Sequence, residues 1–142
     1  MGNKIIGFIT ILAVSAILLS ACDSTNAQAP LTGSSWTLVS YGPESGQTPA
    51  AEGVETSLNF GKDGQVNGSL GCNQFGGDYS LKDGKLVFGM LVSTMMACPE
   101  PQMTQESTSF KVLNGTINYT VKDRTLTLYA ADNTVMLTLS QK

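Results

Sequence analysis

The chain has 142 residues, with 8 Lys and Arg against 11 Asp and Glu, no histidine and three cysteines. This is the size of one ordinary domain. The net charge of −3 without a basic cluster argues against a nucleic-acid partner, because binding phosphates requires clustered Lys and Arg. The common zinc sites include histidine, and histidine is also the commonest general base in catalysis. Because the chain has none, we expect no metal, no cofactor and no catalytic residue.

The N-terminus has the pattern of an export signal. Lys4 precedes an uncharged, mostly apolar stretch over residues 5–19. That stretch is short for a membrane span but typical of the apolar core of a signal peptide. At its end, Leu19-Ser20-Ala21-Cys22 resembles the lipobox of bacterial lipoproteins. The resemblance implies that residues 1–21 are removed as a lipoprotein signal peptide and that Cys22 receives acyl chains such as palmitate.

Lipidation of Cys22 would bind the protein to a membrane of the bacterial cell envelope, because two acyl chains give stable anchoring. We expect the outer face of the cytoplasmic membrane, since Asp23 resembles an inner-membrane retention signal; the outer membrane stays open. An uncleaved anchor and a plain secretory signal are the alternatives. Residues 22–32 are expected to form a tether, and residues 33–142 the folded domain.

Short β-strands dominate the expected domain, because apolar and polar residues alternate between Gly, Asn and Asp turns. In the first strand, Trp36, Leu38 and Ser40 are expected to share one face. Asp83-Gly84 is a strong hairpin signal. Leucines alternate with threonines in the last two strands, which is typical of a sheet with one packed face. The expected strands are 36–41, 54–60, 65–70, 78–82, 85–90, 116–122, 125–130 and 134–140, with a loop over 42–53.

One segment has helical rather than strand periodicity. Met103, Phe110 and Leu113 lie seven and three residues apart, which predicts an apolar helical stripe between residues 99 and 114. Gly115 is a suitable left-handed stop. The predicted fold class is α+β, mainly antiparallel β, with a strongly curved sheet or partial barrel and one helix packed on it.

Cys72 and Cys98 form the pair that remains if Cys22 is lipidated. In an oxidising compartment an even number of cysteines favours a disulfide. Two buried free thiols, a redox-active dithiol and a metal pair are the alternatives. The last two are less favoured, because the spacing is not Cys-x-x-Cys and no histidine completes a metal site.

The most specific strings surround these cysteines. Residues 71–79 have the form G-C-N-x-F-x-G-x-Y, residues 94–98 the form T-x-M-A-C, and residues 33–38 read Gly-Ser-Ser-Trp-Thr-Leu. Together they resemble the META domain family over about residues 31–140, and heat-shock lipoproteins of the HslJ type belong to this family. The resemblance implies a small antiparallel β domain with a helix, usually exported or lipid-anchored. The family is linked to envelope stress and antibiotic tolerance, without agreed catalytic residues.

The motif residues are candidates for a binding surface, with a purely structural strand–turn–strand corner as the alternative. Phe75 and Tyr79 are expected to pack beside the disulfide, and Glu106 to be a helix-surface or capping carboxylate. The candidate surface comprises Gly71, Asn73, Phe75, Gly77, Tyr79, Met96 and Ala97.

Two functions of different classes follow from these patterns. The first is a non-enzymatic interaction module that contacts another envelope protein in envelope stress or maintenance. The second is a carrier or sensor of a small apolar ligand held between sheet and helix, suggested by Met90, Met95, Met96 and Met103. An enzyme is disfavoured, because no nucleophile has a recognisable activating base.

Overall fold

The computed structural model describes residues 31–142. The predicted signal peptide over 1–21, Cys22 and the tether up to residue 30 lie outside the described residues. The elements are β1 (Ser34–Gly42), β2 (Thr48–Pro49), β3 (Ser57–Phe60), β4 (Gln65–Ser69), β5 (Gln74–Lys82), β6 (Lys85–Ser93), α1 (Gln102–Val112), β7 (Thr116–Lys122), β8 (Thr125–Tyr129) and β9 (Met136–Gln141).

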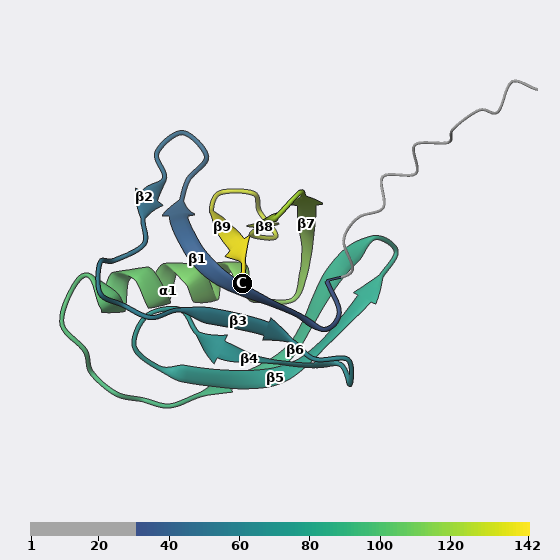
Figure 1. Ribbon diagram of the computed structural model, residues 1–142, viewed down its shortest axis with the longest axis horizontal. Coiled ribbons are helices and arrows are strands. Elements are labelled where there is room, and N and C mark those ends of the chain that lie inside the picture. The colour runs from purple at the N-terminus through teal and green to yellow at the C-terminus, as the bar shows by residue number, and fades with distance from the viewer. Residues whose placement is uncertain (1–30) are drawn as a thin grey trace, which may run out of the picture.

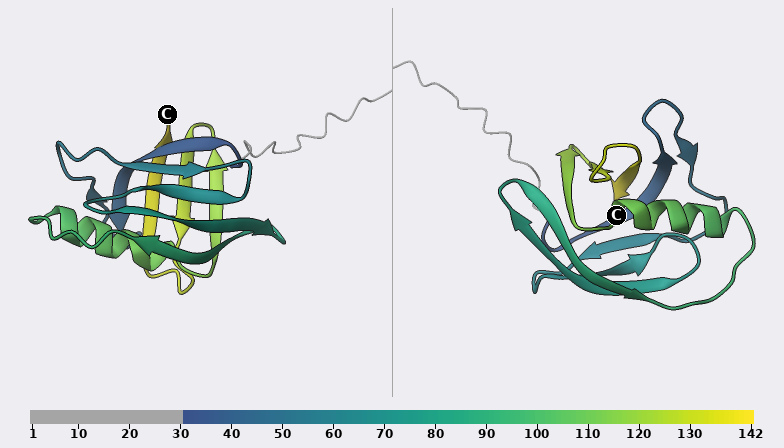
Figure 2. Two further views of the ribbon diagram at one scale, coloured as in Figure 1. Left: turned by 90° about the horizontal axis from the view of Figure 1, so that it is seen from below. Right: turned by 180° about the vertical axis from the view of Figure 1, so that it is seen from behind.

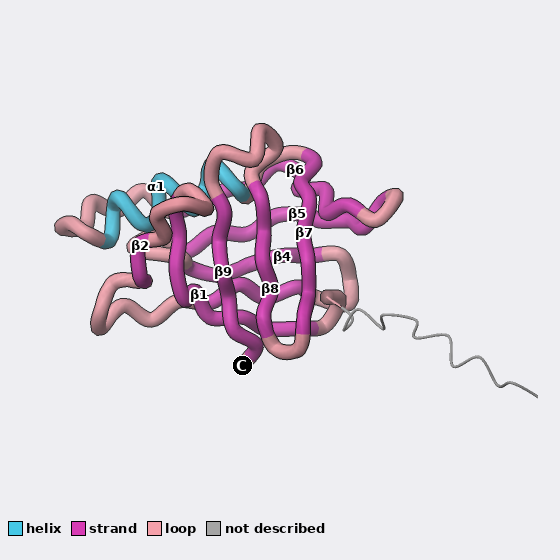
Figure 3. Tube along the Cα trace, turned by 90° about the horizontal axis from the view of Figure 1, so that it is seen from above, coloured by secondary structure: helices cyan, strands magenta, loops and turns pink. Residues whose placement is uncertain are grey.

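The strands form one antiparallel sheet that closes on itself. From β3 to β9 each strand pairs with the next in the chain, β1 pairs with β3, and β9 pairs back with β1. β2 is a short addition to β1. Figure 3 shows β7 to β9 crossing over β4 to β6, so the barrel has two nearly orthogonal layers. The predicted α+β fold is confirmed, and the curved sheet is a closed barrel.

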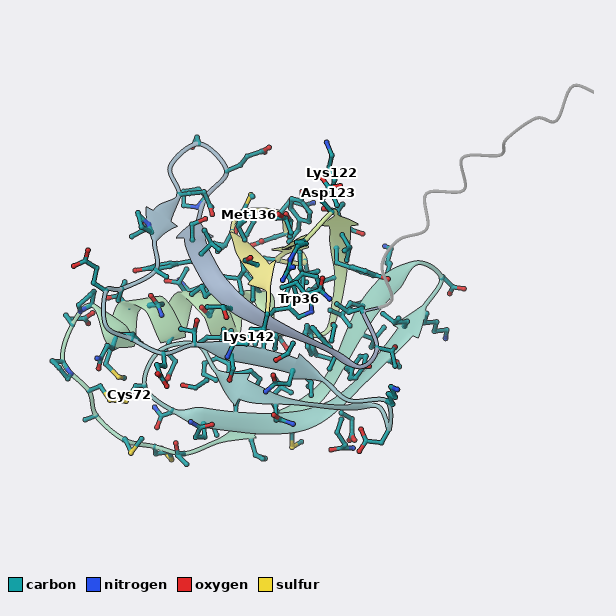
Figure 4. All side chains as sticks on the ribbon, in the orientation of Figure 1. Trp36, Cys72, Lys122, Asp123, Met136 and Lys142 are labelled. Carbon is teal, nitrogen blue, oxygen red and sulfur yellow. A yellow bond between two sulfur atoms is a disulfide. The ribbon has the colours of Figure 1, made fainter. Side chains whose placement is uncertain are left out.

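The barrel interior is filled by large apolar side chains. Trp36 on β1 is fully buried and points between the two layers (Figure 4). The leucines predicted to face inward on β8 and β9 are completely buried, while the threonines between them are half-exposed. The largest fully buried apolar side chains are Trp36, Phe60, Leu31, Leu58, Leu70, Leu86, Ile117, Leu126, Leu128, Leu137 and Leu139.

The prediction that Ser40 shares the face of Trp36 and Leu38 is wrong. The register of β1 against β9 shifts between Leu38 and Ser40. Such a bulge inserts an extra residue and changes which side chains point inward. Tyr41 is therefore buried in place of Ser40, and Val39 is exposed.

Strands β5 and β6 are longer than predicted, because glycines that suggest a loop lie inside β5. A Cβ on Gly77 would lie 2.5 Å from the carbonyl oxygen of Met90 on β6. Only glycine allows the two strands to approach so closely at this point. The turn after β5 is as predicted: Asp83 and Gly84 both have positive φ, at 52° and 73°, as a two-residue hairpin requires.

Helix α1 lies at the left end of the barrel in Figure 1, against β1 and β9. The predicted apolar stripe is only partly correct, because Met103 and Phe110 are half-buried. The helix instead buries Gln105, Glu106, Ser109 and Val112. A helix with such a polar buried face needs hydrogen bonds to the sheet and loops to hold it in place. Within residues 31–142 no helix is long and apolar enough to cross a membrane.

The chain enters the domain at the opposite end. Leu31 is 2% exposed and belongs to the core, so the packed domain includes a residue that was expected to lie in the tether. The N–H of Gly33 donates to the carbonyl oxygen of Phe60 at 2.7 Å. Figures 1 and 2 place this entry at the same end of the barrel as the β5–β6 hairpin, away from the start of α1.

Gln105 generates a first prediction. Its Oε1 accepts from the N–H of Ala51 at 2.7 Å, and its Nε2 donates to the carbonyl oxygen of Leu70 at 2.7 Å. Gln105→Leu is more apolar, yet we expect it to lower the free energy of unfolding by about 2–4 kcal/mol, because two backbone groups lose their partners. Urea unfolding measures the loss. Thr104→Leu, on the exposed side of the same turn, is the control; equal unfolding midpoints for the two variants would contradict the prediction.

Candidate functional site

The strings around the two cysteines, residues 71–79 and 94–98, meet at a corner between β4, β5 and α1. Glu106 is 6% exposed, and its two carboxylate oxygens accept three hydrogen bonds from residues 72 and 73. Oε2 accepts from the backbone N–H of Cys72 at 2.8 Å and from that of Asn73. Oε1 accepts from Nδ2 of Asn73 at 2.7 Å. The expectation of a surface or capping carboxylate is wrong, because Glu106 fixes the helix to the corner.

Asn73 carries the connection onward to the segment after β6. Its Oδ1 accepts from the Thr94 hydroxyl at 2.8 Å and from the Met96 N–H at 2.7 Å. Its Nδ2 donates to the Met96 carbonyl at 3.2 Å as well as to Glu106. An asparagine side chain offers two donors and two acceptor sites, and here all four are used. The side chain therefore joins three segments that are distant in sequence.

A disulfide closes the same corner. Cys72 and Cys98 are bonded, with 5.9 Å between their Cα atoms and a separation of 26 positions in sequence. Figure 4 shows Cys72 at the α1 end of the barrel. The bond joins the corner before β5 to the segment that leads into α1. This segment, residues 94–101, contains no helix or strand; the disulfide and the Asn73 contacts hold it, together with hydrogen bonds between Thr94 and Gln74.

Gly71 permits the close approach of α1. A Cβ at this position would lie 2.6 Å from the carbonyl oxygen of Gln102 and 2.7 Å from Cβ of Glu106. Any side chain here would push the helix away from the corner. Gly76 differs, since a Cβ there would make only ordinary contacts at 3.6 Å and beyond.

The remaining candidate residues separate into two groups. Phe75 lies near the helix, with its ring centroid 5.5 Å from that of Phe110 in an edge-on arrangement. Tyr79 is further along β5, where it packs on Phe60 at 4.9 Å and donates to the carbonyl oxygen of Gly61 at 2.7 Å. Tyr79 therefore supports the barrel beside the β3–β4 turn. Met96 and Ala97 are exposed on the segment after β6.

A groove lies beside the corner, between α1 and β6. β6 pairs with β7 only through Leu86–Ile117 and Val87–Thr116, so β6 and β7 separate beyond that point. One hollow of about 340 Å³ has a lining that includes Met90, Leu91, Phe110 and Leu113. A second, of about 390 Å³ and mostly apolar, follows toward the start of α1. Its lining includes Asn73, Ser93, Met95, Met96, Met103, Ser107 and Phe110.

The edge of β6 that borders this groove has no strand beside it. Phe88 still donates to the Gly115 carbonyl at 2.9 Å, but among the described residues no strand pairs with residues 89–93 on this side. Unpaired strand edges are templates for another extended chain. Sequence reasoning missed both the groove and the edge, because neither is visible until β6 and β7 are seen to separate.

The polar groups of the corner have a structural role: they attach α1 and residues 94–98 to the start of β5. We call this set of contacts the structural lock. Every buried side-chain nitrogen and oxygen in residues 31–142 has a hydrogen-bond partner. Both oxygens of Glu106 are occupied, and both thiols are consumed by the disulfide. Across the described part of the chain, no group of three His, Cys, Asp or Glu side chains is placed to hold a metal ion. The larger hollow of the groove, with its mostly apolar lining, is the feature suited to binding.

Comparisons with known proteins agree with this architecture. The META domain family model matches residues 29–142. No curated protein matches the chain. An NMR structure of a protein from Burkholderia xenovorans is 27% identical, with a TM-score of 0.70 over 94% of this chain and 99% of that chain.

Two further solved structures share the fold. A second NMR structure is 24% identical, with a TM-score of 0.59 over 76% of this chain and 88% of that chain. The crystal structure of a DUF4847 family protein from Bacteroides vulgatus is 13% identical, with a TM-score of 0.54 over 76% of this chain and 92% of that chain. At these identities the likeness concerns the fold alone.

Glu106 provides the sharpest test of the corner. Glu106→Gln keeps the size of the side chain but replaces one carboxylate oxygen by an NH₂ group. That NH₂ group faces a hydrogen-bond donor of residue 72 or 73, which in the native protein donates to the carboxylate. We expect the free energy of unfolding to fall by about 2 kcal/mol, the scale of hydrogen bonds to a charged group. Chemical denaturation measures the effect. Glu44→Gln, at an exposed loop position, is the matched control. If Glu106→Gln lowers the free energy of unfolding no more than this control does, the Glu106 hydrogen bonds do not stabilise the corner.

The disulfide gives a second test at this corner. Closing a 26-residue loop stabilises a protein by about 3.5 kcal/mol in the chain-entropy model. Reduction of the native protein should therefore lower its Tm by several degrees, which differential scanning calorimetry measures. A Cys72→Ser/Cys98→Ser double variant should start from the lower Tm and not respond to reductant. If the native protein is equally unresponsive, the bridge does not contribute as proposed.

Proposed function

The chain belongs to the META domain family, and we propose that it is a non-enzymatic, lipid-anchored binding module of the bacterial cell envelope. In this proposal Cys22 carries the acyl chains, and the domain contacts another envelope protein in envelope maintenance or stress. The support for the anchor comes from the lipobox-like residues 19–22 and the apolar stretch before them.

One observation carries the binding role: the groove between β6 and α1 is open, and its larger hollow has a mostly apolar lining. Its walls include Leu91, Met103 and Phe110, and the unpaired edge of β6 runs along it. Grooves of this kind suit an extended or helical segment of a partner polypeptide. The absence of histidine and the full use of the Glu106 oxygens within the corner support a function without catalysis.

A small apolar ligand is the second candidate, and a specific observation favours it. The larger hollow is lined by the side chains of Met95, Met96, Met103 and Phe110, and methionine adapts readily to apolar ligands. The contact between α1 and the barrel is itself occupied by Gln105 and Glu106. The ligand would therefore lie in the open groove. Native mass spectrometry of gently extracted protein distinguishes the candidates, since it detects a retained small apolar mass.

The main proposal is tested by photo-crosslinking in living cells. A photoreactive amino acid at Ser93, beside the groove, should give a discrete crosslinked protein band, whereas the same group at the exposed Thr120 on β7 should not. Ser107→Arg, which places a bulky cation in the groove from an exposed helix position, should abolish the band. Thr120→Arg is its control.

Two results would overturn parts of this proposal separately. Equal crosslinking at both positions, or a band that survives Ser107→Arg, would remove the groove as the binding site. A Cys22→Ser chain that is still acylated and processed would remove the anchor. A reproducible turnover of an envelope substrate, lost on changing one Asp or Glu, would replace the binding role with an enzymatic one.

A further inference from the structure

A row of exposed apolar side chains follows β6 and the segment after it, and three of them, Met90, Met95 and Met96, also border the groove. The exposed fractions are 85% for Met90, 66% for Val92, 98% for Met95 and 54% for Met96. We call these four residues the methionine ridge. Large side chains of this kind are rarely left together in water unless they meet a protein or a membrane.

A bulge in β6 produces the ridge. Tyr79 pairs with Phe88 and Gly77 with Leu91, so Gly89 and Met90 together oppose the single residue Asp78. Phe88 points into the core and Leu91 lines the groove, while Met90, at the border of the groove, and Val92 are largely exposed. Lys85 is exposed at the start of the same strand. The ridge thus has a cationic end at the β5–β6 hairpin and an apolar remainder.

We propose that the methionine ridge lies on the membrane to which the domain is anchored, so that the barrel rests on its side against the lipid headgroups. This inference rests on the lipid anchor of the proposed function. It adds an orientation and a second, non-covalent contact, whose partner is a bilayer surface that contains anionic lipid.

The length of chain before the domain supports a bilayer as the surface that the ridge contacts. From Cys22 to Leu31, where the chain enters the core, nine residues span at most about 30 Å. The entry and the β5–β6 hairpin lie at the same end of the barrel (Figures 1 and 2). β6 itself has nine residues, or about 30 Å. A domain lying on its side therefore brings the whole ridge to the surface within reach of its anchor.

Charge complementarity points the same way. The hairpin at the anchored end carries the exposed residues Lys82 and Lys85 with one carboxylate, Asp83. Basic groups beside an apolar face are attracted to anionic headgroups, and long lysine side chains extend to them while their stems remain near the apolar layer. Asp78, opposite the bulge, accepts a hydrogen bond from Gln65 on β4.

A second copy of this chain fits the ridge less well. Four side chains in a row are far fewer than the 20–30 residues per partner that a standard protein interface uses. A few apolar side chains suffice for a membrane contact when a covalent anchor already holds the domain at the surface.

Methionine oxidation on the lipidated chain tests the proposal. The protein is purified with its acyl group, the mass at Cys22 is verified, and it is placed in vesicles of phosphatidylethanolamine and phosphatidylglycerol. Dilute hydrogen peroxide is added, and peptide mass spectrometry follows each methionine. A protease site inserted in the tether releases the domain for comparison. If the ridge is bound nine-tenths of the time, Met90 and Met95 oxidise about tenfold more slowly before release than after it.

Matched controls separate the possible outcomes. Met136 on β9, half-buried and outside the ridge, should oxidise equally in both states. Lys82→Glu/Lys85→Glu should reduce the protection, and Lys122→Glu, on the β7–β8 hairpin, should not; equal loss in both would overturn the orientation. Equal oxidation of the ridge before and after release overturns the membrane contact, even with Cys22 acylated. Protection that persists after release points to a second copy of the chain. Protection found only in native envelope vesicles points to a partner protein. Either result also overturns the membrane contact. An unacylated Cys22 refutes the anchor instead.

Discussion

The bond between the Glu106 carboxylate and the backbone of Cys72 and Asn73 is the constraint on which the α1 end of the barrel depends. It turns two backbone N–H groups at a corner into the docking point of a helix. Gln105 does the same for the carbonyl of Leu70 and the N–H of Ala51. Because α1 buries polar side chains, these bonds replace the apolar contact that usually holds a helix on a sheet.

Contacts at the same corner also hold residues 94–98, which form no helix or strand. Asn73 binds Thr94 and Met96, and the disulfide attaches Cys98 to Cys72. Residues 94–98 are thereby held in place although their side chains are largely exposed. A rigid backbone that presents exposed methionines is well suited to binding, since little conformational entropy is lost when a partner or a surface covers them.

The barrel concentrates its binding surface in one region. β6 leaves β7 beyond Phe88, so this part of the β6 edge is unpaired among residues 31–142. At this gap the groove faces α1, and the methionine ridge forms its exposed border along β6 and the segment after it. One irregular strand therefore carries both the unpaired edge proposed to bind a protein and the exposed side chains proposed to contact lipid.

The sequence by itself determined the repeated strands, the hairpin at Asp83-Gly84 and the helix before Gly115, because these depend on local periodicity and turn geometry. It also indicated the disulfide, because Cys72 and Cys98 are the pair that remains once Cys22 is set apart. Tertiary structure alone decided the roles of Glu106 and Gln105, whose partners lie more than 30 residues away. It also decided the bulges that bury Tyr41 and expose Met90, since register depends on pairing between strands. The closed barrel and the gap beside β6 have the same origin: they exist only when distant segments pack together, and no local pattern encodes where that packing stops.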